Sequence, residues 1–158
     1  MSDLPYRRYL PGIAADSAPV PPSIPEQLLA LLNAERAKVI GLPLLRGHWL
    51  MDRCANIRVV DMITGNYFAH EDPDQVPGKY YEVMQQQGIT AYAWAGENLG
   101  LTNAANWMTQ LVGLWMASPG HRANVLSPEF DTVGTGHGLR FDGVHIVANI
   151  FVGGANLP

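Results

Sequence analysis

The stretch WMASPGHRANVLSP, residues 115–128, joins an apolar helical segment to a run of strand-like sequence. Because a residue that precedes proline disfavours helical geometry, the first helix should end near Ala117. Ser118 can then serve as the N-cap of a new short turn, with Pro119 at its first position. His121 falls in that turn, where free backbone N–H groups and a positive helix end disfavour imidazolium. The pattern predicts a neutral histidine that can ligate a metal or accept a proton. The alternative is that His121 only makes local hydrogen bonds and packs against its neighbours.

Two further ionisable residues lie in apolar settings. Glu97 stands in WAGENLG, residues 94–100, where a buried carboxylate costs on the order of several kcal/mol unless a cation, a metal or donor hydrogens accompany it. The alternative is an exposed loop glutamate. His70 stands in NYFAHEDP, where Pro73 breaks the helix that an HExxH zinc-protease motif requires. The alternative for His70 is a histidine at a helix end that is not a ligand. Our hypothesis is that His70, Glu97 and His121 meet in one cleft.

The composition excludes several classes of protein. The chain has 158 residues, enough for one domain with a filled core, and its net charge is −4. Its basic residues are scattered singly, which is not the pattern of a nucleic-acid-binding protein. The sequence has no run of eighteen apolar residues, so no membrane span is predicted. The first residues do not form a signal peptide as they stand. The one cysteine, Cys54, excludes a disulfide within the chain and is predicted to be a buried, inert thiol.

The chain divides into a proline-rich leader or linker, residues 1–24, and a globular domain, residues 25–158. Helical patterns are predicted for residues 25–41, 50–63, 79–87 and 103–117. The second has a buried stripe of Met51, Ala55, Val59 and Met62. Residues 71–78, EDPDQVPG, form an acidic loop, and residues 91–101 read as a loop or short strand.

Strands are expected from Phe130 onward, joined by a hairpin through Asp142 and Gly143. His137 and His145 fall in these strands and are predicted to be surface or sheet-face residues. Because the helices come first and most strands last, the order favours an α+β fold.

Five segments, in this order, resemble the CAP superfamily of cysteine-rich secretory proteins, venom antigens and plant pathogenesis-related proteins, and look most like its bacterial branch without cysteines. They are LLNAERAKVIGLPLLRG (31–47), GNYFAHEDPD (65–74), AGENLG (95–100), WMASPGHRANVLSPEF (115–130) and IVANIFVGG (146–154). The resemblance covers nearly everything from Pro25 to Gly154.

The resemblance implies a three-layer α-β-α sandwich with a small, mostly antiparallel central sheet and a cleft lined by two histidines and two glutamates. The family histidines fall on His70 and His121, and one glutamate falls on Glu97. The other glutamate position is occupied by Ser118, which leaves two histidines and one glutamate to bind zinc or another divalent metal. Without the second carboxylate, this set is expected to bind a metal more weakly. Ser118 and Asn98 are expected to line the cleft.

Three functions are consistent with these observations. The resemblance favours a secreted or envelope-associated protein, located outside the cell or in its envelope. Its cleft would bind a small ligand, a lipid or an envelope partner, and could also hold zinc. The first alternative is a metal-dependent hydrolase of peptide or cell-wall amides, with Glu97 as third ligand or general base. The second is a purely structural interaction module. A fold and its cleft do not by themselves fix an activity.

Overall fold

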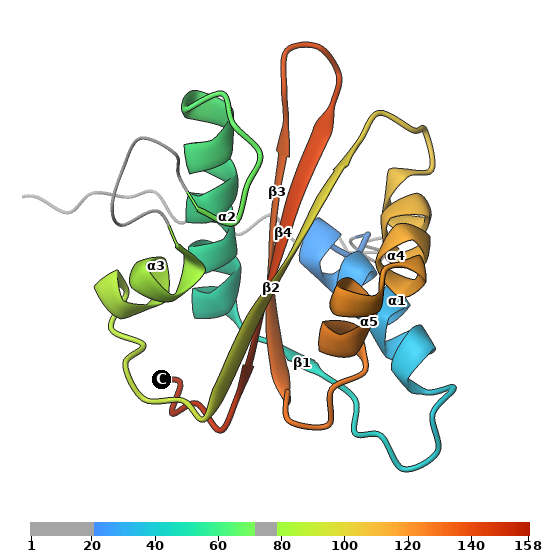
Figure 1. The fold of residues 1–158 in the computed structure, drawn as a ribbon, viewed down its shortest axis with the longest axis vertical. Coiled ribbons are helices and arrows are strands. Elements are labelled where there is room, and N and C mark those ends of the chain that lie inside the picture. Colours follow the sequence, from blue (N-terminus) through green and yellow to red (C-terminus); the bar gives the residue numbers. More distant parts are fainter. Residues whose placement is uncertain (1–20, 72–78) are drawn as a thin grey trace, which may run out of the picture.

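A four-stranded sheet lies between two layers of helices in the computed structural model, which describes residues 21–71 and 79–158 (Figure 1). The predicted leader up to residue 20 and residues 72–78 of the acidic loop lie outside these ranges. The elements are α1 (Ile24–Arg36), β1 (Arg46–Gly47), α2 (Trp49–Thr64), α3 (Tyr80–Gln86), β2 (Trp94–Thr102), α4 (Trp107–Ala117), α5 (Pro119–Val125), β3 (Thr132–Leu139) and β4 (His145–Gly153).

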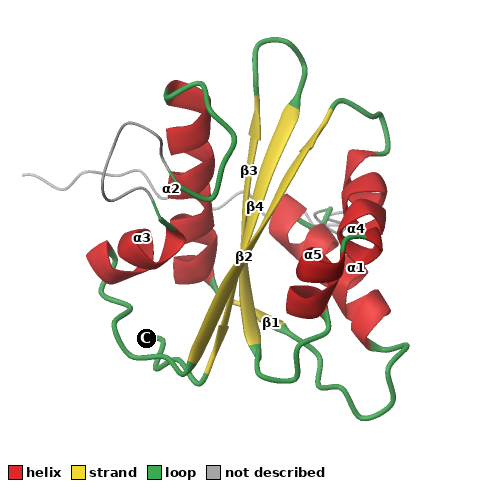
Figure 2. Cartoon of the chain, viewed as in Figure 1, coloured by secondary structure: helices red, strands yellow, loops and turns green. Residues whose placement is uncertain are grey.

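The strands lie in the order β1-β3-β4-β2, so that β2 forms one edge of the sheet. β4 pairs antiparallel with both β2 and β3, while the short β1 pairs parallel with β3. Helices α2 and α3 cover one face, and α1, α4 and α5 cover the other (Figure 2). This arrangement confirms the predicted three-layer sandwich with a mostly antiparallel sheet.

Helix α2 packs closely against β3. Its predicted stripe is buried, with Met51, Ala55, Val59 and Met62 all almost inaccessible to solvent. Glycines on β3 make this approach possible: a Cβ atom on Gly134 would lie 2.0 Å from the carbonyl carbon of Met51. Gly134 and Gly136, whose Cβ atoms would meet the backbone of Met51 and Ala55, are therefore required by the contact with α2.

Helices α1 and α4 form most of the opposite layer. Their core includes Leu28, Leu32, Leu111 and Trp115, and the indole N–H of Trp115 donates to the carbonyl of Leu99 in β2 at 2.7 Å. Helix α4 ends at Ala117 as predicted but begins at Trp107, four residues later than expected. The helix begins later because β2 pairs with β4 as far as Thr102, so residues 103–106 form the connection between β2 and α4.

Helix α1 ends at Arg36, not near the predicted Gly41. The Arg36 side chain is fully buried, and its guanidinium must find acceptors there. It donates to the carbonyl oxygens of Pro43, Val125, Ser127 and Phe130. The chain turns back after α1, so Val39 lies beyond the end of the helix and is exposed.

Residues 94–102 form a full strand of nine residues, not the predicted loop or short strand. Every residue of β2 has a partner in β4, from Trp94 opposite Gly153 to Thr102 opposite His145. Two glycines within β2 concealed it, because glycine is depleted in strands. A Cβ atom on Gly96 would lie 3.1 Å from Oδ1 of Asn124, and one on Gly100 would lie 2.9 Å from Cδ2 of Leu111, so both positions are tightly packed.

Candidate functional site

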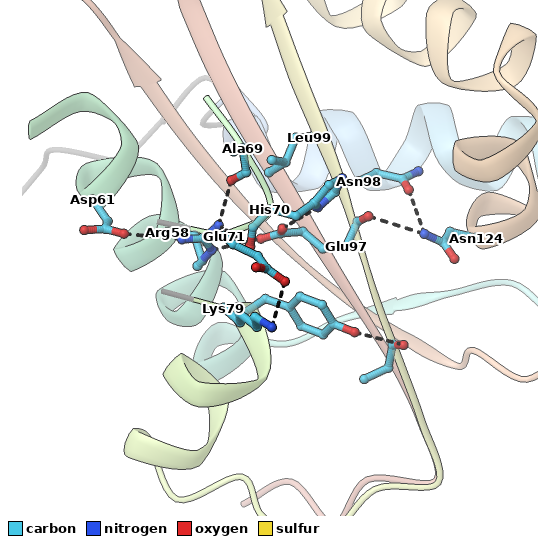
Figure 3. Close-up of polar contacts among 12 residues, drawn as sticks. Arg58, Asp61, Ala69, His70, Glu71, Lys79, Glu97, Asn98, Leu99 and Asn124 are labelled. Atoms are coloured by element: carbon cyan, nitrogen blue, oxygen red, sulfur yellow. Dashed lines mark hydrogen bonds and ion pairs between the residues drawn. The ribbon is translucent and has the colours of Figure 1, made fainter. Parts of the chain in front are cut away.

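The candidate site lies on edge strand β2, where neighbouring side chains point to opposite faces of the sheet. Glu97 points toward α2 and the segment that carries His70, while Asn98 points toward Asn124 of α5 (Figure 3). Side chains from both helical layers are therefore brought to the same edge of the sheet.

The side chain of Glu97 has no solvent-exposed surface, and both carboxylate oxygens have partners. Oε1 accepts a hydrogen bond from Nε of Arg58 at 3.1 Å, and Oε2 lies 2.8 Å from Nδ1 of His70. The cation required by a buried carboxylate is thus supplied by the protein itself.

Arg58 is completely buried and uses all of its guanidinium nitrogens. Besides Glu97 it donates to the carboxylate of Asp61, the hydroxyl of Tyr67, and the backbone carbonyls of Ala69 and His70. The last two contacts fix the backbone at His70, so Arg58 positions both members of the His70–Glu97 pair.

Arg58 was not predicted as a site residue, although the sequence carries a signal for it. Positions 51, 55, 58 and 62 are spaced four, three and four apart, so Arg58 lies on the apolar stripe of α2. An arginine at such a position needs a buried anion or carbonyl groups to accept its hydrogen bonds.

His70 is half-exposed and bonded to Glu97 through Nδ1. The hydrogen bond with the Glu97 carboxylate raises the pKa of His70 above its ordinary value of 6.5. Since the carboxylate accepts a proton-bearing Nδ1, the neutral ring carries its lone pair on Nε2. The arrangement thus selects the tautomer that is ready to ligate a metal or accept a hydrogen bond.

His121 is the third residue of α5 and is partly buried. Burial lowers the pKa of His121, and the nearby charge of His70 lowers it further. The predicted preference for a neutral ring is therefore met mainly through burial. The backbone of His121 is held by Asn98, whose Nδ2 donates to its carbonyl at 3.0 Å. Asn124 in turn donates to Oδ1 of Asn98 at 2.8 Å.

Ser118 occupies the N-cap position of α5, as predicted, with Pro119 in the first turn. Its side chain does not make the capping hydrogen bond, which corrects that part of the prediction. Its backbone carbonyl instead accepts from the N–H of Arg122 at 2.8 Å, because residues 119–125 continue as a helix.

The structure therefore joins His70 to Glu97 directly, while His121 comes to β2 from the opposite helical layer, with its backbone held by Asn98. Within residues 21–71 and 79–158, no three His, Cys, Asp or Glu side chains form a group that could hold a metal ion. Both carboxylate oxygens of Glu97 already contact Arg58 and His70.

Two further residues, His48 and Cys54, take ordinary structural positions. His48 precedes α2 and caps it, with Nδ1 accepting from the N–H of Leu50. Cys54 is fully buried, and burial raises the pKa of its thiol to about 11, as expected of an unreactive cysteine. Among the helices that the structure describes, none has the length and apolar character needed to cross a membrane.

Residues 29–152 match the family profile described as CAP, the cysteine-rich secretory protein family. A curated relative, the uncharacterised protein YkwD of Bacillus subtilis strain 168, is 36% identical over 112 residues. The match covers 71% of this chain and 41% of YkwD, so the chain spans less than half the length of this relative.

Solved structures show the same fold. An extracellular protein containing an SCP domain from Bacillus anthracis superposes with a TM-score of 0.64 at 28% identity, over 82% of this chain and 40% of that one. An outer surface protein from Borrelia burgdorferi superposes with a TM-score of 0.66 over 80% of this chain and 90% of its own. At 16% identity, this second likeness concerns the fold alone.

Proposed function

The chain belongs to the cysteine-rich secretory protein (CAP) family, and on that premise we propose that it is a secreted or envelope-associated binding protein. Its binding site is the β2 edge, where His70 and His121 take a divalent metal such as zinc and with it a ligand or partner. The description of the Bacillus anthracis relative as an extracellular protein supports this location.

The observation that carries the proposal is the 2.8 Å contact between Nδ1 of His70 and Oε2 of Glu97. Histidines that ligate metals commonly pass their second ring N–H to a carboxylate, which fixes the tautomer and raises the basicity of the ligating nitrogen. Burial favours the neutral form of His121, which can offer a lone pair near neutral pH. The pKa of His70 is raised, so a metal must displace a proton from its Nε2 when it binds.

In this proposal His70 and His121 hold the metal, and Glu97 orients His70 without serving as the third ligand. A bound divalent metal would supply a Lewis-acidic centre with positions open to water or to an anionic ligand. Ser118, at the position of the second family glutamate, contributes no negative charge, so we expect the metal to bind loosely. Asn98 acts from behind the site through its hydrogen bond to the backbone of His121.

The contacts favour binding over hydrolysis. A general base needs a carboxylate that is free to take a proton from water. Glu97 instead pairs with the buried guanidinium of Arg58 and with His70. We therefore do not propose Glu97 as a catalytic base.

Zinc titration by calorimetry on chelator-treated protein tests the proposal. We expect His70→Gln and His121→Gln each to remove one zinc equivalent, and Glu97→Gln to weaken that binding by about 10–100-fold through the loss of its orienting contact. His48→Gln is the matched control, because His48 caps α2 away from the site and should leave the isotherm unchanged. Zinc isotherms that are identical in the wild type and in both site variants would refute the metal site.

A second candidate function is the binding of an apolar ligand, such as an alkyl chain, elsewhere on the domain. A hollow of about 570 Å³ lies between α1 and the start of α4, and its lining includes Ala30, Leu31, Trp107 and Met108. Hollows of this size with mainly apolar walls are typical of small-molecule sites.

Binding of a dansyl-labelled fatty acid tests this second function. We expect Ala30→Arg to abolish the fluorescence increase by filling the hollow, and Leu114→Arg, on the exposed side of α4, to preserve it. An equal signal from both variants would exclude the hollow as the binding site.

A further inference from the structure

A cluster of three rings lies outside the β2 edge site. It consists of His137 on β3, His145 on β4 and Trp107 at the start of α4. β3 and β4 run side by side in the sheet (Figure 1), and His145 pairs with Leu139, two residues beyond His137. The two imidazoles are therefore diagonal neighbours on the face that α4 covers.

The imidazoles face each other through ring nitrogens. Nε2 of His137 lies 2.9 Å from Nδ1 of His145, so in the neutral pair one ring donates its N–H to the other. Two nitrogens that ligate a tetrahedral zinc at about 2.0–2.1 Å each lie roughly 3.3 Å apart. The observed separation needs to open by only a few tenths of an ångström to admit such an ion.

We propose that His137 and His145 form a second site, a two-histidine chelate for a divalent transition metal, between Nε2 of His137 and Nδ1 of His145. On binding, the ring that donated the bridging hydrogen bond moves its proton to its outer nitrogen. Both inner lone pairs then face the metal, and the neutral pair neither gains nor loses a proton. Water completes the coordination.

Trp107 holds both rings in place for this role. Its indole stacks on His137 at 4.6 Å and on His145 at 4.7 Å, with interplanar angles of 14° and 16°. Trp107 is itself buried, so it forms a fixed platform beneath the two imidazoles. Rings that are already oriented lose little conformational entropy when they bind.

The ligands determine the class of metal. Imidazole nitrogen suits zinc, nickel and copper, whereas calcium and magnesium require oxygen ligands. Burial and the neighbouring His145 both lower the pKa of His137, which keeps its ring neutral and available at neutral pH. The site does not use His70, Glu97 or His121, so it stands independently of the proposed function.

The test uses the full chain with His70→Gln and His121→Gln together, which removes the β2 edge site. We expect calorimetry to retain one zinc equivalent in this double variant. Adding His137→Gln or His145→Gln should weaken that binding on the order of tenfold or more, since each removes one of two ligands. Adding His48→Gln instead is the control and should change nothing.

A second measurement does not depend on how these added substitutions fold. In a long-range proton–nitrogen spectrum of the double variant, zinc should shift Nε2 of His137 and Nδ1 of His145 and leave the nitrogens of His48 in place. Copper(II) should quench tryptophan fluorescence strongly in the double variant and weakly once Trp107→Phe is added. The proposal is overturned if the double variant binds no zinc at millimolar concentration, or if the shifted nitrogens belong to other residues.

Discussion

Arg58 and Glu97 form an ion pair in which neither side chain is exposed to solvent, with Nε and Oε1 3.1 Å apart. The pair joins α2 to β2 across 39 positions of sequence. Because Glu97 also holds His70, the geometry of the β2 edge site depends on an interaction inside the core. A buried pair of this kind contributes little net stability but is costly to break on one side only.

The first prediction concerns the removal of the cation. Arg58→Met leaves the Glu97 carboxylate buried without its guanidinium, and we expect the free energy of unfolding to fall by about 3–5 kcal/mol. Urea denaturation at neutral pH measures the change. Arg53→Met, on the exposed side of the same helix, is the control and should stay within about 0.5 kcal/mol of the wild type.

The double variant Arg58→Met/Glu97→Met separates charge from packing. We expect it to be more stable than Arg58→Met alone, because no unpaired charge remains buried. If the double variant is the less stable of the two, the loss comes from packing and the charge argument fails.

The second prediction concerns the pKa of His70. In Glu97→Gln the charge and the charge-assisted hydrogen bond that raise this pKa are lost, while burial and the Arg58 cation, which lower it, remain. We expect the pKa of His70 to fall below its ordinary value of 6.5, as measured by proton NMR of the imidazole. The exposed Glu129→Gln variant should leave it unchanged, and an unshifted His70 in Glu97→Gln would contradict the assigned contact.

The third prediction concerns stability and pH. Because the folded state raises the pKa of His70 above 6.5, protonated His70 stabilises the fold below that pH, and its contribution disappears as the pH rises through the folded-state pKa. We expect His70→Gln to be destabilising at about pH 6 and much less so at about pH 9. His121, whose pKa is lowered, has the opposite dependence.

The comparison is therefore made in a His121→Gln background, which removes the second titrating ring of the site. Denaturation of His121→Gln and of His70→Gln/His121→Gln across this range isolates the contribution of His70. A difference between the two that grows with pH would show that His70 is not stabilised by a carboxylate.

The fourth prediction concerns two glycines with opposite roles. Gly134→Ala places a Cβ 2.0 Å from the Met51 backbone and must push α2 away from β3, so we expect a large loss of thermal stability. Gly113→Ala, in the interior of α4 with no atom within 4 Å of the new Cβ, should stabilise the protein by up to about 1 kcal/mol. Thermal melts of the two variants should shift in opposite directions.

Local patterns predicted much of the fold. The stripe of α2 and the end of α4 before Pro119 follow from helical periodicity and from the restriction that proline places on the residue before it. Sequence patterns gave the wrong secondary structure where pairing with a distant segment decided it. Gly96 and Gly100 make β2 look like a loop, yet nine consecutive pairings with β4 hold it as a strand.

The sequence alone determined most of the helices and the two C-terminal strands, the family to which the chain belongs, and that Glu97, if buried, would need a cation, a metal or hydrogen-bond donors. Only the tertiary structure decided that this partner is Arg58, that Glu97 meets His70, and that His137 and His145 stack together on Trp107. The physical reason is that periodicity and capping act over a few residues, whereas a buried charge selects its partner from whatever the packed layers bring within hydrogen-bonding distance.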